Sequence, residues 1–163
     1  MMSTNMNLRP ADADDAKNIW LWRNHPDARA VSFSSDPIPF EDHVSWYETR
    51  LSDKDNVFLI IQDSDNLDVG YTRFLIEDDR AEISIALAKE AQGQRLGTAA
   101  ILAASNRVLE QGSVHSITAQ IKVGNAISER VFLRAGYRTS KDFTGESNYI
   151  ELVFDGIEPE IGN

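Results

Sequence analysis

The chain has 163 residues, of which 42% are hydrophobic and 26% charged, as is ordinary for one globular domain with a core of its own. Its formal net charge of −10 excludes nonspecific binding to nucleic acid, because no basic surface is left to neutralise phosphates, although a local field can still hold a small anion. The absence of cysteine excludes disulfides, thiol catalysis and thiolate metal sites.

The N-terminal stretch MMSTNMNLRPADADD has neither the basic nor the apolar segment of a signal peptide, and no apolar run reaches membrane-spanning length. We therefore expect a cytoplasmic protein with no membrane and no nucleic acid as a partner. A single domain over residues 1–163 is expected, with its core between about 6 and 155 and a loose tail after Asp155.

The first part of the chain predicts a strand followed by a helix. The short strand is expected over residues 6–9. Asp12 or Asp14 can cap a helix that reaches about Arg23. Pro26 then ends the helix, because a proline disfavours helical backbone at the residue before it.

A second helix and three consecutive strands follow. The helix is expected over 40–51, where apolar residues recur at spacings of four, three and four, at Phe40, Val44, Tyr47 and Leu51. Strands are expected over 57–62, 69–76 and 81–87. The short polar turns DSDNLD and EDDR that join these strands indicate an antiparallel meander.

The last part of the chain alternates helices with strands. Helices are expected over 95–111 and 125–135, each followed by a glycine that suits a left-handed cap. Strands are expected over 116–123 and 149–154. The whole order, β α α β β β α β α β, predicts a protein of the α/β (α+β) class.

The stretch QGQRLGTA, residues 92–99, joins the third meander strand to the next helix. A helix N-terminus presents unpaired N–H groups and partial positive charge, and glycine lets the backbone approach a bulky anion. Gln94 and Arg95 can add side-chain donors, so the junction suits a pyrophosphate. It is not a Walker A loop, since Thr98 stands where lysine would be needed. A plain turn with two glycines remains the alternative.

The segment QGQRLGTAAIL resembles motif A of the GNAT superfamily of acyl-CoA N-acetyltransferases. Gln92 matches the first position of the motif, Gly97 its last glycine and Ala99 the small residue that follows. Arg95 stands where the middle glycine is usual, but its backbone still offers one N–H donor.

A second segment, VGNAISERVFLRAGY, resembles the downstream motif of the same family, with Asn125 placed to contact the CoA arm. The resemblance covers nearly the whole chain and implies the GNAT fold, a mixed and mostly antiparallel central sheet with helices on both faces. It also implies acetyl-CoA as cosubstrate and no metal. The cofactor-binding residues it implies are Ile85, Leu87, Gln92, Gly93, Gln94, Arg95, Leu96, Gly97, Thr98, Asn125, Ser128 and Phe132.

Two backbone donors in this set have a further implied role. In the family, N–H groups of the strand before the junction stabilise the oxyanion, and here these belong to Ile85 and Leu87. The resemblance implies that a bulge makes this strand splay from its neighbour and frees the donors.

Catalysis on an amine also needs a base. Alternation along 81–87 places Glu82 and Ser84 on one face of the strand. Glu82 is the candidate base, directly or through water, and Ser84 can relay a proton. The alternative for Glu82 is a solvated charge beside Arg73 or Arg80.

The family's usual general acid is missing. It is a tyrosine in the second motif, and Phe132 occupies that position here. Either water protonates the thiolate, or another group such as Ser128 or Tyr71 does. Phe132 is also the best support for another hypothesis, a noncatalytic CoA-binding module.

The segment WLWRNHPDARAVSFSSDPIPFEDHVSWYETRL resembles the GNAT subgroup that acetylates the 4-amino group of nucleotide-linked deoxyamino sugars, as in pseudaminic acid biosynthesis. A small-molecule amine, a nucleotide-linked amino sugar, is therefore the expected partner, with a ribosomal-protein N-terminus or a small amine as alternatives, and a homodimer is possible. Structural roles stay open for several of the candidate substrate residues, which are Arg23, Asn24, His43, Trp46, Tyr71 and Arg73.

Overall fold

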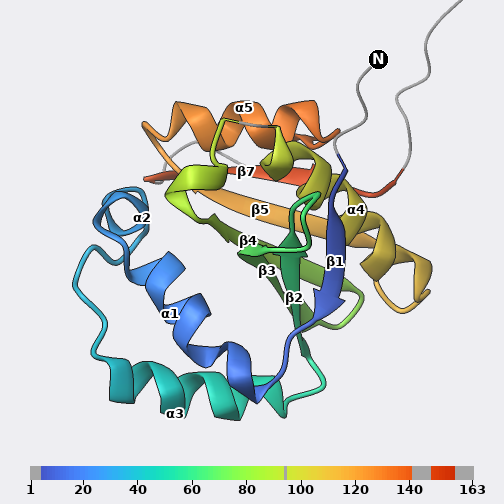
Figure 1. The fold of residues 1–163 in the computed structure, drawn as a ribbon. Coiled ribbons are helices and arrows are strands. Elements are labelled where there is room, and N and C mark those ends of the chain that lie inside the picture. Colours follow the sequence, from blue (N-terminus) through green and yellow to red (C-terminus); the bar gives the residue numbers. More distant parts are fainter. Residues whose placement is uncertain (1–4, 94, 141–147, 157–163) are drawn as a thin grey trace, which may run out of the picture.

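The computed structural model describes residues 5–93, 95–140 and 148–156. Its centre is a seven-stranded sheet in the order β1-β2-β3-β4-β5-β7-β6, with helices on both faces (Figure 1). The strands are β1 (Asn7–Pro10), β2 (Asn56–Gln62), β3 (Asp68–Glu77), β4 (Arg80–Leu87), β5 (Ser116–Lys122), β6 (Arg138–Thr139) and β7 (Tyr149–Phe154). The helices are η1 (Ala13–Asp15), α1 (Ala16–Asn24), α2 (Pro26–Ala30), α3 (Phe40–Leu51), η2 (Lys89–Ala91), α4 (Leu96–Glu110) and α5 (Ala126–Arg134). This is the mixed, mostly antiparallel α/β architecture expected from the sequence.

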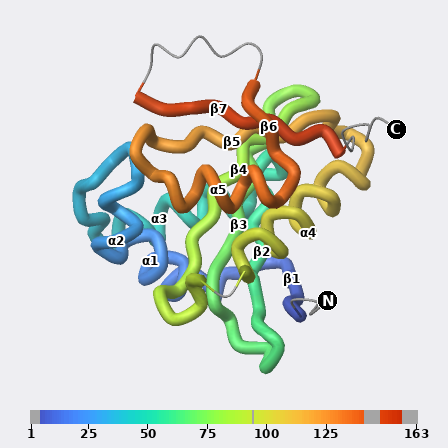
Figure 2. Tube along the Cα trace, turned by 90° about the horizontal axis from the view of Figure 1, so that it is seen from above, coloured from blue at the N-terminus to red at the C-terminus, as the bar shows by residue number. Residues whose placement is uncertain are grey.

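Two separate apolar clusters cover the two faces of the sheet. On one face α4 and α5 lie next to each other, as the view from above shows (Figure 2), and they pack on strand residues such as Phe74 and Ile117. On the other face α1 and α3 bury Ile19 and Tyr47 against Phe58 and neighbouring residues of β2 and β3. Successive side chains of a strand point to opposite faces of the sheet, so each strand can contribute residues to both clusters.

Strands β4 and β5 are neighbours for only part of their length. They pair in parallel from Arg80↔Ser116 to Glu82↔Thr118, and no pairing follows although β4 continues to Leu87. The two strands therefore part after Glu82. All other neighbouring strands in the described sheet are antiparallel.

The prediction of a bulge in β4 is wrong. The register between β3 and β4 runs without a shift from Gly70↔Leu87 to Glu77↔Arg80. Strand β4 keeps its full pairing with β3 while its other edge leaves β5, so the splay needs no extra residue.

The predicted elements agree with the structure to within one or two residues, but α2, β6 and the short helix η2 were missed. Pro26 does end α1, and it is also the first residue of α2. A proline suits that position because its missing N–H would have no helical partner there. The side chain of His25 caps α2 by accepting a hydrogen bond from the N–H of Asp27.

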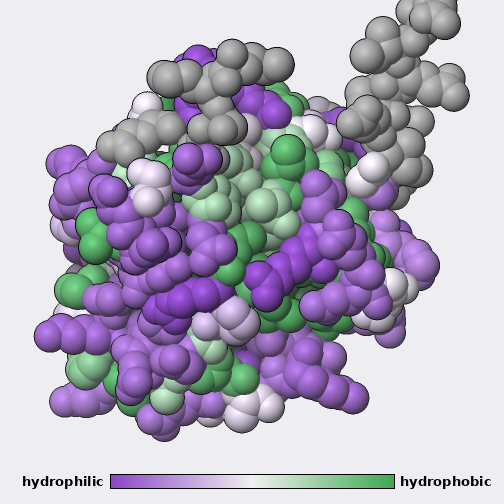
Figure 3. Space-filling view, turned by 45° about the vertical axis from the view of Figure 1, so that its right-hand side comes forward, coloured by the Kyte–Doolittle hydropathy of each residue, from purple (hydrophilic) through white to green (hydrophobic). Residues whose placement is uncertain are grey.

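The face that carries α1 and α3 is polar in its other half. The register places the side chains of β4, β5 and β7 that share this face in line with one another, among them Glu82, Ser84, Thr118, Gln120 and Glu151. Hydrophilic residues also cover most of the side of the molecule drawn in Figure 3, with hydrophobic residues in patches between them. None of the described helices is both long and apolar enough to span a membrane. The predicted tail beyond residue 156 lies outside the described residues.

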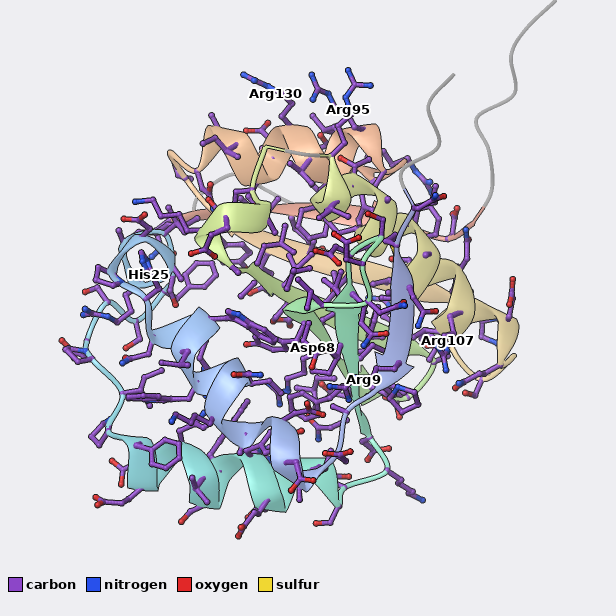
Figure 4. All side chains as sticks on the ribbon, viewed as in Figure 1. Arg9, His25, Asp68, Arg95, Arg107 and Arg130 are labelled. Carbon is purple, nitrogen blue, oxygen red and sulfur yellow. The ribbon has the colours of Figure 1, made fainter. Side chains whose placement is uncertain are left out.

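One arginine ties the first strand to the rest of the domain. The guanidinium of Arg9 donates to both carboxylate oxygens of Asp15, at 2.7 and 3.0 Å, and to both of Asp68, at 2.8 and 3.3 Å. Figure 4 shows Arg9 and Asp68 pointing toward one another from β1 and β3. The hydrogen bond from Arg9 is the main reason why the pKa of Asp68 lies below its usual range.

We predict that Asp68→Asn lowers the free energy of unfolding by about 1–2 kcal/mol at pH 7. A carboxyl group whose pKa is depressed by folding stabilises the native state above its unfolded pKa, near 3.8, and loses that effect as the pH falls through its folded pKa. The deficit of the variant should therefore shrink near pH 3. Urea unfolding at both pH values measures it, with the exposed Asp65→Asn as control. An equal deficit at both pH values would contradict the assignment.

Candidate functional site

The junction between β4 and α4 presents several free backbone donors. The chain passes through η2, turns at Gly93 with φ of 80°, and reaches Arg95, whose φ of 65° is left-handed. Helix α4 then begins at Leu96, and the N–H of Ala99 makes the first helical hydrogen bond, to the carbonyl of Arg95 at 3.2 Å. The N–H groups of residues 96–98 therefore have no partner within the helix and point out of its N-terminus.

The left-handed backbone of Arg95 destabilises this turn by about 1 kcal/mol, since Arg95 is not a glycine. This explains why glycine is usual at the matching position of the motif. Its side chain is exposed, as is that of Arg130 on α5, and both project outward from the same end of the molecule in Figure 4. The two guanidinium groups give this end a basic rim.

Gly97 allows α4 to approach its neighbours closely. A Cβ atom there would lie 3.3 Å from Cγ1 of Val131 on α5 and 3.4 Å from Cδ1 of Leu87 on β4. A Cβ on Gly93, by contrast, would meet nothing within 4 Å. The junction is thus packed on its inner side and open on its outer side.

Gln92 has a structural role at the junction. Its side-chain amide donates to the carbonyl of Leu87 at 3.2 Å and so ties the turn to the end of β4. Gln94, the neighbouring candidate, lies outside the described residues.

The N–H groups of Ile85 and Leu87 point into the space between the parted strands. The N–H of Ala88 donates toward β3, to the carbonyl of Val69 at 2.7 Å. Because N–H direction alternates along a strand, those of Leu87 and Ile85 face the opposite side, where β5 has already separated. The two expected donors are therefore directed away from the sheet ladder.

The three candidates on or before α5 are placed differently. Asn125 is the N-cap of α5, and its side-chain oxygen accepts a hydrogen bond from the N–H of Ser128 at 3.2 Å. Phe132 is 3% exposed and packs edge-on against Tyr137, with ring centroids 5.1 Å apart. Phe132 is thus a core residue in this structure, and nothing in its placement supports a cofactor contact.

Glu82 lies at the point where β4 leaves β5. It borders a hollow of about 400 Å³ that Thr118 and Glu151 also line. Burial raises the pKa of the Glu82 carboxyl above its usual range, Arg73 acts in the opposite direction, and the negative charge of Glu151 raises it further. Ser84, two residues along, is exposed on the same face, as the alternation predicted.

Three of the candidate substrate residues come together. The guanidinium carbon of Arg23 lies 4.2 Å from the centroid of the Trp46 ring, and that of Arg73 lies 5.0 Å from it. Tyr71 is 5% exposed and stacks on Trp22 with centroids 6.4 Å apart. Arg23, Trp46 and Arg73 therefore form one cluster beside Ser84, which pairs with Arg73 in the register.

Asn24 and His43 make structural hydrogen bonds instead. The side-chain oxygen of Asn24 accepts from the N–H of Ile38 at 2.7 Å. His43 is fully buried, and its Nε2 donates to the carbonyl of Ala16 at 2.7 Å, which leaves Nδ1 to accept from Arg23 at 3.3 Å. Burial lowers the pKa of His43, so the ring is neutral and orients Arg23.

A family model described as the Acetyltransferase (GNAT) domain matches residues 5–138. The chain belongs to the GNAT acetyltransferases. It is therefore an enzyme of a family whose acetyl donor is acetyl-CoA. No curated protein sequence matches the chain.

Solved structures share the GNAT fold at low sequence identity. One is spermidine N-acetyltransferase from Vibrio cholerae in complex with CoA and spermine, with TM-score 0.77, 17% identity, and coverage of 91% of this chain and 92% of that chain. A domain from Methanocaldococcus jannaschii has TM-score 0.80 and 21% identity over 94% and 99%. Aminoglycoside acetyltransferase AAC(6')-Ib in complex with coenzyme A has TM-score 0.79 and 16% identity over 93% and 95%. These comparisons support the family and not the nucleotide-sugar subgroup.

The junction of this GNAT domain fits the diphosphate of acetyl-CoA, since it offers free N–H donors, a helix dipole and an open outer side. Among residues 5–93, 95–140 and 148–156, no group of three or more His, Asp or Glu side chains is placed to hold a metal ion. Sequence reasoning missed Arg50 on α3, whose buried Nε has no hydrogen-bond partner among the described residues. The sequence did contain one indication of this: Arg50 follows Trp46 by four residues, which places both side chains on the same face of α3.

We predict that Thr98→Glu weakens acetyl-CoA binding by at least about tenfold, because it places a carboxylate beside the proposed diphosphate position. The same charge at a helix N-terminus stabilises the helix, so the melting temperature should not fall. Isothermal calorimetry and thermal unfolding measure both, with the neutral Thr98→Gln as matched control. Equal affinities of the Glu and Gln variants would refute the diphosphate position.

Proposed function

We propose that this acetyltransferase uses acetyl-CoA to acetylate an amine that binds at the opening between β4 and β5, next to Glu82. The observation that carries the proposal is the parting of these strands directly after Glu82↔Thr118, on the strand whose last residue, Leu87, packs against the first turn of α4 at Gly97. Bound acetyl-CoA supplies the acetyl group as a thioester.

Each part of the opening has one task in this proposal. The N–H groups at the start of α4 hold the diphosphate, and those of Ile85 and Leu87 hold the thioester oxygen. Glu82 takes the proton of the amine, directly or through water, and Ser84 relays it. The raised pKa of Glu82 makes it a stronger base than an ordinary surface carboxylate.

The proton for the leaving thiolate comes from a group other than residue 132, since Phe132 is buried and carries no proton to give. Burial raises the pKa of the Tyr71 hydroxyl, so that it stays protonated at neutral pH. Tyr71 pairs with Ala86 on β4 and shares the face of Glu82. We therefore propose Tyr71 or a water molecule as the donor.

For the acceptor we propose the nucleotide-linked deoxyamino sugar that the first third of the sequence indicates. The support is the cluster of Arg23, Trp46 and Arg73, which offers cationic groups for a phosphate and an aromatic ring for stacking. A second candidate is a polycationic amine, favoured by the acidic side chains around the hollow at Glu82, which include Glu77, Asp78, Asp79 and Glu151. Similar structures are those of a spermidine and an aminoglycoside acetyltransferase.

We predict that Glu82→Gln lowers kcat by about 10²–10³-fold while the affinity for acetyl-CoA stays the same. In the unmodified enzyme the rate should rise with pH as Glu82 loses its proton, at a pH above the usual carboxyl range, because its pKa is raised. The rate of the Glu82→Gln variant should not show this rise with pH.

The measurement is CoA release at a series of pH values with a panel of amines. Glu110→Gln is the control, since Glu110 is exposed at the C-terminal end of α4 and does not line the hollow. Full activity of Glu82→Gln would exclude its role as base. Acetyl-CoA binding with no turnover on any amine would favour the noncatalytic module.

A further inference from the structure

Three arginines from three different elements converge near Trp46. Arg23 on α1 and Arg73 on β3 both lie over the Trp46 ring, at 4.2 and 5.0 Å. Arg50 is one turn further along α3 from Trp46, so its side chain leaves the same face of that helix. We call Arg23, Arg50, Arg73 and Trp46 the arginine cluster.

No described carboxylate forms an ion pair with the arginine cluster. Within the described residues, no Asp or Glu oxygen lies within 4.0 Å of a guanidinium nitrogen of these three arginines. The polar partners are neutral: Arg73 donates to the side-chain oxygen of Asn56 at 2.9 Å and Arg23 to His43 at 3.3 Å. The Nε of Arg50 is buried and has no hydrogen-bond partner among these residues.

This arrangement is costly for the free protein. Burial lowers the pKa of Arg73, and the positive charges of Arg50 and Arg23 lower it further, while Tyr71 and the carboxylate of Glu82 act in the opposite direction. Arg9, by contrast with these three arginines, forms ion pairs with two aspartates, at 2.7 and 2.8 Å. In a chain with 26 acidic residues, three partly buried arginines that form no ion pair with a described carboxylate make a site that an external anion would complete.

The arginine cluster lies beside the proposed position of the amine. Arg73 pairs with Ser84 in the register, and Glu82 lies two residues before Ser84 on the same face of β4. Two residues of an extended strand span about 7 Å. One small molecule can therefore reach both the cluster and Glu82.

We propose that the arginine cluster binds an oxyanion, a carboxylate or a phosphate, carried by the acceptor whose amine meets Glu82. This inference rests on the proposed function and narrows its substrate class to amines that also bear an anionic group. The acidic hollow then receives the ammonium end of the acceptor, and the cluster receives its anionic end.

The first test compares amines in pairs that differ in the anion: glucosamine 6-phosphate against glucosamine, and lysine against cadaverine. We expect kcat/KM to be about ten- to hundredfold higher for the anionic member of at least one pair. Arg50→Gln should reduce that preference to about one, whereas Arg134→Gln, an equal charge change at an exposed residue of α5, should keep it.

The second test needs no turnover. Removing Arg50, which repels Arg73 and whose buried Nε has no partner among the described residues, should leave the melting temperature of Arg50→Gln equal to or above that of the unmodified protein. Inorganic phosphate, compared with chloride at equal ionic strength, should raise the melting temperature of the unmodified protein and of Arg134→Gln more than that of Arg50→Gln.

Equal phosphate effects in all three proteins, or a lower melting temperature of Arg50→Gln, would overturn the anion site and give the cluster a structural role. Acetylation of only the amines that lack an anionic group would do the same; it would leave the acetyltransferase activity in place and favour the polycationic acceptor over the nucleotide-linked sugar. If phosphate stabilises as expected but no amine is acetylated, the anion site stands and the proposed function fails.

Discussion

The parting of β4 from β5 is the constraint on which the site depends. Strand β4 is fully paired with β3 on one edge, so the N–H groups of Ile85 and Leu87 on the other edge lose their partners where β5 turns away. An unpaired N–H that is shielded from water costs about 1–3 kcal/mol, which a bound carbonyl oxygen would recover. Gly97 lets the N-terminus of α4 pack against Leu87 and Val131 at this same place, and so brings the anion-binding end of the helix to the gap.

Charge is distributed unevenly across a strongly acidic protein. Acidic side chains surround the hollow at Glu82, whereas arginines without carboxylate partners gather near Trp46 on the same face of the sheet. A polyamine would complement only the first of these features. An amine that also carries an anionic group would complement both, and this is the physical reason for preferring such an acceptor.

The sequence was informative where structure is local. Helix ends and strand alternation follow from caps and spacing, so the face of Glu82 could be predicted. The helix after Pro26 was missed because a proline that ends one helix can also begin the next. Roles that depend on distant neighbours could not be foreseen. His43 is fully buried and bonded to Ala16 and Arg23, and Arg50 comes close enough to repel Arg73 only because α3 packs on the sheet. The end of pairing between β4 and β5 is likewise a property of the sheet and not of either strand.

A crystal structure of the complex with acetyl-CoA is the most direct test of the central claim. The account predicts diphosphate oxygens at about 3 Å from the N–H groups of residues 96–98, and the thioester oxygen at a similar distance from the N–H of Ile85 or Leu87, between β4 and β5. A complex in which the diphosphate binds away from α4, or in which β5 closes onto β4 beyond Glu82, would contradict it.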